Sequence, residues 1–235
     1  MASMVTTGGI LADIGTDHAY VPIALVQRQK IKGAIAMDIN EGPLARAQEH
    51  IRAARLEEYI QTRLSDGAEA LLPNEADSIL IAGMGGELIL HILTEGESVC
   101  STAKELILQP QSEIHKVREY LRQHQYKIED EDMVCEEGKY YPMMRVHYQA
   151  EKNEDADKTI KDMENSKEQK KSRYKVECLY GRYLLMEKNP VLHQYLVKER
   201  QVFENILDNL FKQPESEKIA VRMEEVKEAL GYNLS

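Results

Sequence analysis

The chain has 235 residues, a net charge of −10 and 43% hydrophobic residues, which predicts a folded core and does not favour nonspecific binding to nucleic acid. No apolar run is long enough to span a bilayer, and no basic segment precedes an apolar stretch near the N-terminus, so we expect a cytoplasmic protein with no membrane partner. Three cysteines without a CxxC pair indicate reduced thiols and no metal site.

The first informative stretch is an apolar run that ends on an acid and a glycine, L-A-D-I-G-T-D-H-A-Y at residues 11–20. It predicts a strand, a tight turn at Gly15, and a helix over residues 20–26 with Pro22 in its first turn. Glycine permits unusual backbone conformations and lets a ligand approach closely. An ordinary strand-to-helix turn explains the same pattern, so this stretch alone does not assign a site.

Strand and helix patterns alternate over the next hundred residues. The pattern predicts strands at 32–38, 62–67, 77–82 and 106–110, a turn at 40–43, and helices at 44–54, up to Leu71, at 87–93 and at 114–124. Two further strands, 127–135 and 140–148, flank a glycine-containing turn and predict a hairpin. Such alternation is typical of a parallel sheet with helices on both faces. We therefore predict an α/β fold whose mostly parallel sheet gains one antiparallel strand from the hairpin.

The chain changes character near residue 150, and we predict one domain over residues 1–150 and a second over residues 151–235. Apolar residues spaced by three and four run from Pro190 to Leu210 and again from Ile219 to Leu230. This spacing predicts two helices that form an antiparallel hairpin. Glu199 stands where an apolar residue would continue the first stripe.

Acids and glycines follow four of the predicted parallel strands, where ligands bind in such sheets. These positions are Asp13 with Gly15, Asp38, Asp66 with Gly67, and the three glycines within residues 83–86. A dinucleotide fingerprint and a phosphate-binding loop are both absent from the sequence, so a nucleoside cofactor without a phosphate chain fits best. S-adenosylmethionine meets this description, because its cationic groups suit an acidic site and its ribose and adenine donate to carboxylates.

On this hypothesis Asp13 and the Gly15 loop hold the methionine end of the cofactor. Asp38 accepts from both ribose hydroxyls, and Asp66 accepts from the adenine amino group. The glycines at 83–86 leave room for a flat base beside the methyl donor. Helix capping by Asp38 or a plain turn at Asp66 explains each residue singly. Only their convergence on successive strand ends favours a site.

Five stretches carry a family resemblance. They are L-A-D-I-G-T-D-H-A-Y (11–20), D-I-N-E-G-P (38–43), I-A-G-M-G-G (81–86), L-I-L-Q-P (106–110) and E-E-G-K-Y-Y (136–141). The chain resembles the bacterial tRNA (adenine-22) ring-N1 methyltransferases, a class I S-adenosylmethionine-dependent family. The resemblance implies a Rossmann-like methyltransferase sheet, tRNA as substrate, and a coiled-coil-like helical hairpin that helps to hold tRNA.

With this resemblance, the candidate cofactor-binding residues are Asp13, Gly15, His18, Tyr20, Asp38, Ile39, Asp66, Gly67, Gly83, Met84 and Gly85. The candidate substrate-binding residues are Gln109, Tyr140, Lys170, Lys171 and Arg173. Adenine N1 already has a free lone pair, so catalysis is mostly positioning. The product base gains a positive charge, and we expect Asp17 to stabilise that charge as the catalytic residue. Helix capping is the alternative role for Asp17.

Two other functions remain compatible with the sequence. One is an S-adenosylmethionine-dependent methyltransferase that acts on a small molecule or a protein. The other is a non-catalytic module that binds RNA or protein and retains the fold. For single residues, core packing explains Tyr140, and a solvated helix face explains the basic cluster at residues 167–175.

Overall fold

The computed structural model describes residues 1–149, 167–214 and 216–234, without the side chains of residues 167–170 and 217. The chain divides into two compact units, which we describe separately. The first comprises residues 1–131 and 141–152, and the second comprises residues 132–140 and 153–235. The domain boundary near residue 150 stays a prediction. In the described ranges, every helix is too short or too polar to cross a bilayer.

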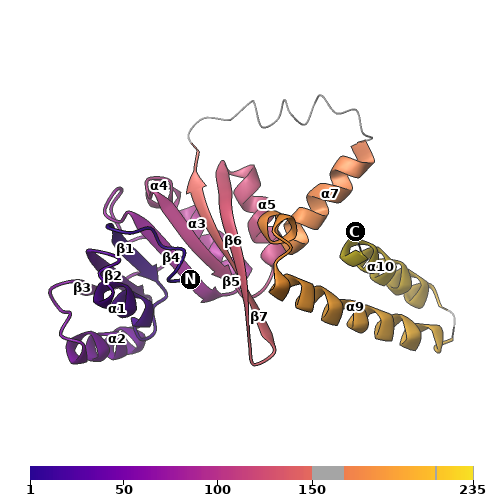
Figure 1. The fold of residues 1–235 in the computed structure, drawn as a ribbon, viewed down its shortest axis with the longest axis horizontal. Helices are drawn as coiled ribbons and strands as arrows, with labels where there is room; N and C mark the ends of the chain where they lie inside the picture. The colour runs from indigo at the N-terminus through magenta and orange to yellow at the C-terminus, as the bar shows by residue number, and fades with distance from the viewer. Residues whose placement is uncertain (150–166, 215, 235) are drawn as a thin grey trace. The chain divides into compact units, whose positions relative to one another are not determined.

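The first unit is built on a seven-stranded sheet in the order β3-β2-β1-β4-β5-β7-β6 (Figure 1). The strands are β1 (Ile10–Ile14), β2 (Gly33–Asp38), β3 (Ile60–Leu64), β4 (Ser78–Met84), β5 (Glu105–Pro110), β6 (Tyr126–Glu136) and β7 (Lys139–Tyr148). Strands β1 to β5 pair in parallel, and β7 pairs antiparallel with β5. The predicted Rossmann-like sheet with its closing hairpin is therefore confirmed.

Two hydrophobic cores cover the two faces of this sheet. The helices of the unit are α1 (Tyr20–Gln27), α2 (Glu41–Ala53), α3 (Gly86–Glu95), α4 (Glu97–Cys100) and α5 (Ile114–Gln123). Because strand side chains alternate between faces, Ala12 and Ile14 of β1 pack with α3 and α5, whereas Leu11 packs with α1 and α2. This arrangement leaves the carboxyl ends of the parallel strands as the edge where the loops gather.

Two local predictions were wrong. Residues 41–43 form the first turn of α2 rather than a separate turn, with Asn40 as the N-cap residue, because proline is tolerated in the first turn of a helix. No helix follows β3 up to Leu71 in the described chain. There the Ser65 hydroxyl accepts from the Ala70 N–H at 3.1 Å, and such side-chain bonds to the backbone compete with helix formation.

The first residues of the chain belong to the core, which their sequence did not indicate. Met4 and Val5 are buried against the face that α1 and α2 cover. The N–H and hydroxyl of Thr6 donate to the carboxylate of Glu105 at 2.6 and 2.7 Å. The segment is thus fixed by apolar burial and by a buried acid of β5.

The second unit consists of helices and the tip of the β6–β7 hairpin. Its helices are α7 (Lys167–Tyr180), α8 (Arg182–Met186), α9 (Pro190–Phe211) and α10 (Glu217–Leu234). The Asn189 side chain caps α9 by accepting from the N–H groups of Val191 and Leu192 at 2.9 and 3.1 Å. Helices α9 and α10 lie against each other, which confirms the predicted C-terminal helical hairpin. Its coiled-coil character stays a prediction.

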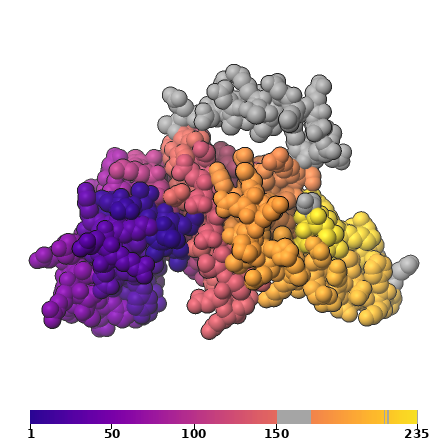
Figure 2. Space-filling view, viewed as in Figure 1, coloured from indigo at the N-terminus to yellow at the C-terminus, as the bar shows by residue number. Residues whose placement is uncertain are grey.

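A small apolar cluster joins the hairpin tip to the helices of the second unit. Met133 of the tip is buried with Tyr180, Leu184 and Leu192, and the space-filling view shows the tip in contact with these helices (Figure 2). Glu199, which interrupts the apolar stripe of α9, is accommodated in this packing by hydrogen bonds.

Polar groups from three helices converge on Glu199. Its carboxylate accepts from the hydroxyls of Tyr180 and Tyr195 at 2.8 and 2.7 Å. It also accepts from the Asn233 amide at 3.0 Å. A half-buried carboxylate is tolerated when its oxygens are hydrogen-bonded in this way, which explains why an acid interrupts the apolar stripe.

Candidate active site

The loop between β1 and α1 makes a tight turn at the carboxyl end of the central strand. Gly15 has a φ of +79°, and the N–H groups of Gly15 and Thr16 both donate to the Met37 carbonyl at 2.8 Å. A Cβ atom on Gly15 would lie 2.0 Å from the terminal methyl carbon of Met84. The backbone conformation therefore favours glycine here, while the flexible end of Met84 could move to admit a larger residue.

Asp13 carries a carboxyl group in an apolar environment at the end of β1. Its side chain is only 8% exposed, and burial raises its pKa to about 6, while a hydrogen bond with Thr16 acts in the opposite direction. Burial disfavours the charged form of an acid. A cationic ligand group beside Asp13 would restore that charge, so this position suits an ammonium group.

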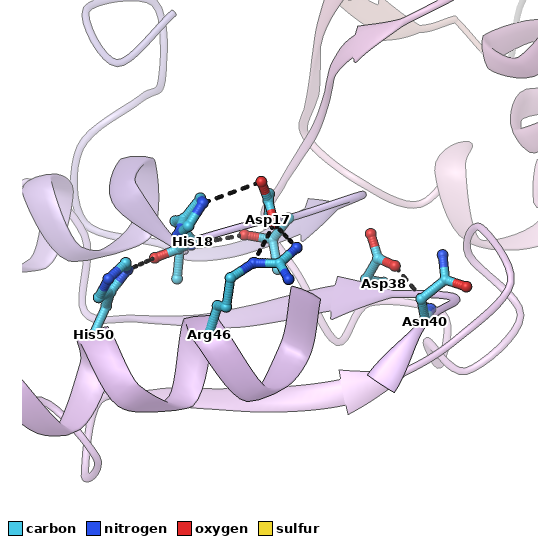
Figure 3. Close-up of polar contacts among 8 residues, drawn as sticks. Asp17, His18, Asp38, Asn40, Arg46 and His50 are labelled. Atoms are coloured by element: carbon cyan, nitrogen blue, oxygen red, sulfur yellow. Dashed lines mark hydrogen bonds and ion pairs between the residues drawn. The ribbon is translucent and has the colours of Figure 1, made fainter. Parts of the chain in front are cut away.

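Asp17 lies at the centre of a polar cluster built by the β1–α1 loop and helix α2 (Figure 3). Its Oδ1 accepts from Nε of Arg46 at 3.0 Å and also from Nη2 of the same guanidinium. Its Oδ2 lies 3.1 Å from Nε2 of His18. The hydrogen bond from Arg46 lowers the pKa of Asp17 more than any other effect. Asp17 is therefore held in the charged state.

Helix capping does not explain Asp17. The N-cap residue of α1 is Ala19, which adopts a left-handed conformation with φ +54°. Its N–H donates to the Thr16 hydroxyl at 3.2 Å. Thr16 thus stabilises the entry to the helix, and the Asp17 carboxylate is engaged elsewhere.

Three rings stack beside Asp17. The rings of His18, Tyr20 and His50 lie 4.9 to 5.2 Å apart, centroid to centroid, and are nearly parallel. Nδ1 of His50 lies 3.2 Å from the His18 carbonyl oxygen, which ties α2 to the loop. Tyr20 is 63% exposed. The stack therefore fixes the loop conformation and presents an aromatic ring to solvent.

A shallow depression follows the ends of β2 and β3. Its volume is about 370 Å³, and it is lined by Ile39, Leu64, Ser65, Asp66, Glu69 and Ala70. Asp38 lies beside it, and its Oδ1 accepts from the Asn40 N–H at 2.8 Å. Among the described residues, Oδ2 of Asp38 has no hydrogen-bond donor. Exposed Ile39 beside exposed acids is an arrangement that suits a nucleoside, with an apolar contact for the base and acceptors for its hydroxyl and amino groups.

The glycine loop after β4 is held by the end of β5. Gly83 has a φ of +77°, and its N–H donates to Oε1 of Gln109 at 3.0 Å. Nε2 of Gln109 donates to the Pro110 carbonyl at 3.3 Å. A Cβ atom on Gly86 would lie 2.5 Å from the Ser112 carbonyl oxygen. Gln109 therefore fixes the loop, and its contact with substrate stays a prediction.

The strand register brings the predicted cofactor residues to one edge of the sheet. Asp13 lies opposite Ala36 of β2 and Leu80 of β4, and Asp38 lies opposite Leu64 of β3. The positions after β1, β2, β3 and β4 are thus adjacent although they are far apart in the sequence. Their individual roles stay predictions.

The remaining candidate substrate residues belong to the second unit. The Tyr140 ring packs edge-on against Tyr195 at 5.2 Å. Lys171 is exposed, and Arg173 pairs with Glu177 at 3.1 Å. The Lys170 side chain lies outside the described residues. Contacts of all four with RNA stay predictions.

Sequence reasoning missed three residues of the polar cluster. Thr16 had a recognisable signal, because a hydroxyl residue shortly before a helix is a common cap. Arg46 and His50 gave no such signal, because they lie 29 and 32 positions from Asp17 and His18. Only the packing of α2 beside the loop brings them into contact.

Comparison with known proteins agrees with this geometry. Residues 1–144 match a family described as a methyltransferase domain. The chain is 33% identical over 239 residues to the tRNA (adenine(22)-N(1))-methyltransferase of Bacillus subtilis strain 168, covering 99% of this chain and 94% of the relative. The chain belongs to the tRNA (adenine-22)-N1-methyltransferase family.

Two solved structures extend the family likeness to three dimensions. The m1A22 tRNA methyltransferase TrmK of B. subtilis is 31% identical, with a TM-score of 0.80 and coverage of 99% of this chain and 93% of that chain. Sp1610 of Streptococcus pneumoniae, a putative tRNA (m1A22) methyltransferase in complex with S-adenosyl-L-methionine, is 34% identical, with a TM-score of 0.75 and coverage of 97% and 95%. Both coverages include the helical hairpin as well as the sheet.

The site residues fit the cofactor of this methyltransferase family. Asp13 offers a buried carboxylate to an ammonium group, and Asp38 keeps one unoccupied acceptor beside the depression. In the described part of the chain, no three His, Cys, Asp or Glu side chains are grouped as metal ligands. S-adenosylmethionine is the cofactor of the enzyme.

Proposed function

We propose that this chain transfers a methyl group from S-adenosylmethionine to ring nitrogen N1 of adenine 22 in tRNA. The observation that carries this proposal is the 33% identity to the B. subtilis enzyme of that activity over 99% of the chain. The local chemistry supports it, because the carboxyl edge of the sheet gathers acids and glycines suited to a cationic nucleoside.

We assign the parts of the cofactor to three strand ends. Asp13 and the turn at Gly15 hold the methionine end, where the buried carboxylate faces the ammonium group. Asp38 accepts from the ribose hydroxyls, with its Oδ1 already oriented by the Asn40 N–H. Asp66 and Ile39 line the depression that receives the adenine.

The reaction needs positioning more than proton transfer. The bound cofactor supplies an electrophilic methyl group. The target adenine must leave its stack, and its N1 lone pair then forms the new bond to carbon as the carbon–sulfur bond breaks. The base gains one positive charge, which the Asp17 carboxylate stabilises. The glycines at 83–86 leave space for the base.

The helical unit supplies further RNA contacts in this proposal. Lys170, Lys171 and Arg173 lie on α7, Lys171 and Arg173 are exposed, and cations on a protein surface bind phosphates. Replacing all three with glutamate should weaken tRNA binding and make its salt dependence less steep. In the control variant, glutamate replaces Arg222 and Lys227 of α10, which pair with neighbouring glutamates. Unchanged tRNA binding by the triple variant would show that the cluster is an ordinary solvated helix face.

A direct assay tests the whole proposal. The protein is incubated with methyl-labelled S-adenosylmethionine and tRNA that lacks the modification, and the methylated position is then mapped. Label at N1 of adenine 22, and none in tRNA carrying guanine at that position, is the expected result. Transfer only to acceptors other than RNA would favour a methyltransferase of another substrate class. Cofactor binding without any transfer would favour a non-catalytic module.

A further inference from the structure

The ion pair between Arg46 and Asp17 joins helix α2 to the β1–α1 loop. Arg46 extends from α2 and donates to Oδ1 of Asp17 through Nε and Nη2. The two side chains are 48% and 58% exposed. An ion pair this exposed contributes little to stability and is weakened by salt, so its partners separate readily.

This pair conflicts with the role that the proposed function gives to Asp17. A carboxylate stabilises a cationic methylated base through its negative charge, and an adjacent guanidinium cancels much of that effect. The proposed function therefore works better if Arg46 leaves Asp17 when substrate binds. Asp17 would not lose its position, because its other oxygen lies 3.1 Å from Nε2 of His18.

The surroundings of Arg46 favour a phosphate as its next partner. Gly42, one turn earlier on α2, has no side chain of its own beside Nη1 of Arg46, from which a Cβ atom on Gly42 would lie 3.8 Å away, and the Arg46 side chain is 48% exposed. A guanidinium binds a phosphate with two parallel hydrogen bonds, and its planar donor group matches the geometry of a phosphate. A flipped adenosine carries a phosphate one sugar away from the base that Asp17 faces.

The carboxylate of the cofactor is a weaker candidate. The turn proposed to hold the methionine end is buried, with Thr16 only 3% exposed. Its N–H groups point inward to the Met37 carbonyl. Arg46 instead lies on an exposed helix next to the stacked rings, of which Tyr20 is the most exposed.

We propose that Arg46 changes partners during catalysis, from Asp17 in the free protein to a phosphate of the substrate RNA beside the reacting adenosine. The inference rests on the proposed function and adds to it a phosphate contact at the same site. Arg46 then has two effects: it binds the RNA backbone, and its departure from Asp17 leaves the charge of that carboxylate without a guanidinium beside it, so that the charge acts on the base. The exchange links RNA binding to activation of the site.

The first experiment measures the tRNA dissociation constant against salt concentration for the full-length protein. Arg46→Gln should raise the dissociation constant about tenfold at low salt, and the slope of log K against log salt should become shallower by about one unit. Arg46→Lys should restore the slope, because it keeps the charge. The control is Arg52→Gln on the same helix, an exposed residue whose side chain has no hydrogen bond or ion pair among the described residues, and its slope should match the wild type.

The second experiment tests the competition between the two partners. Asp17→Asn leaves Arg46 without its carboxylate, so tRNA should bind about threefold more tightly. The same change in an Arg46→Gln background should leave tRNA binding unaltered. A purely structural role for Arg46 would not produce this dependence of one substitution on the other.

Three results would overturn the inference. The salt slope could be the same for Arg46→Gln and the wild type, or Asp17→Asn could fail to tighten tRNA binding. Alternatively, Arg46→Gln could weaken binding of S-adenosylmethionine rather than tRNA, which would assign the guanidinium to the carboxylate of the cofactor. Methyl transfer by the wild type to tRNA, measured on the same preparation, separates these results from failure of the proposed function.

Discussion

The two edges of the sheet use acidic residues in opposite ways. At the amino-terminal edge, Glu105 is 5% exposed and accepts from the N–H and hydroxyl of Thr6 and from the Ser78 hydroxyl, at 2.6 to 2.7 Å. At the carboxyl edge, Asp38 accepts from one backbone N–H, and the buried Asp13 has a raised pKa. Glu105 is thus fully hydrogen-bonded by the chain, whereas Asp13 and Asp38 are short of partners.

This difference gives a way to distinguish an acid that is available to a ligand from an acid that stabilises the fold. An acid at a strand end is not itself a signal, because both edges contain several. A buried carboxylate whose oxygens are all hydrogen-bonded by the chain, such as Glu105, stabilises the fold. One that is buried without a cation, or that keeps an unused oxygen beside a depression, is available to a ligand.

The largest expected effect is at the amino-terminal edge. Glu105→Ala removes the acceptor of three hydrogen bonds and leaves their donors unsatisfied, so the free energy of unfolding should fall by about 4 kcal/mol. Denaturant titration measures this, and Glu95→Ala, an exposed position on α3, should change it by less than about 0.5 kcal/mol. The affinity of the folded protein for S-adenosylmethionine should not change. An unchanged free energy of unfolding in Glu105→Ala would contradict the structural role assigned to the acid at the amino-terminal edge.

Asp13 should make stability depend on pH in the direction that a buried acid dictates. Its pKa rises from 3.8 to about 6 on folding, so the folded state holds the proton more tightly than the unfolded state. The stabilisation is complete below pH 4 and is lost as the pH rises through 6, by roughly 3 kcal/mol in total. Asp13→Asn should remove this decline.

The measurement is unfolding at pH 4 to 7, with the wild type compared with Asp13→Asn. The affinity of the wild type for S-adenosylmethionine should increase over the same range, because the ionised carboxylate pairs with the ammonium group. Parallel stability curves for the two proteins would show that Asp13 titrates as an ordinary surface acid.

Asp17→Ala should separate catalysis from cofactor binding. The turnover number should fall about 100-fold, because the charge that develops on the base loses its counter-ion. The dissociation constant of S-adenosylmethionine should stay within about twofold. Single-turnover kinetics and calorimetry measure the two quantities, with Glu58→Ala, an exposed acid before β3, as control. Unchanged turnover would exclude Asp17 as the catalytic residue.

The smallest effect is expected at Asp38. Asp38→Asn keeps an acceptor for the Asn40 N–H but loses the charge, so S-adenosylmethionine should bind about tenfold more weakly while stability is preserved. The matched change at the other edge is Asp77→Asn, which alters an acid bound to the Ile10 N–H and to Lys104. That variant should lose stability and keep its cofactor affinity. The reverse outcome for the two variants would contradict the comparison.

The sequence predicted the fold better than its local details. Short apolar runs that alternate with helical patterns predicted a mostly parallel α/β sheet and the closing hairpin, because strands buried on both faces leave nearly continuous apolar stretches in the sequence. The order of the strands in the sheet was not predicted. The helix expected up to Leu71 is absent, because side-chain bonds of Ser65 favour turns. The burial of Met4 and Val5 has no periodic signature in so short a segment.

The candidate site was predictable only where its residues follow strands. The common edge of Asp13 and Asp38 was predictable because parallel strands place their carboxyl ends at one edge of the sheet. Arg46 and His50 were not found, because their contacts depend on how α2 packs beside a loop some thirty residues away. Long-range side-chain contacts of this kind leave no regular spacing in the sequence.

The hairpin has a consequence for protein engineering. Its tip, residues 132–140, shares a core with the helices of the second unit, and Lys198 donates to the Gly138 carbonyl at 3.1 Å. A cassette that ends at residue 150 would carry Met133 and Tyr140 without their apolar cover and would tend to aggregate. A portable version of the sheet needs a shortened hairpin in which a tight turn replaces residues 132–140.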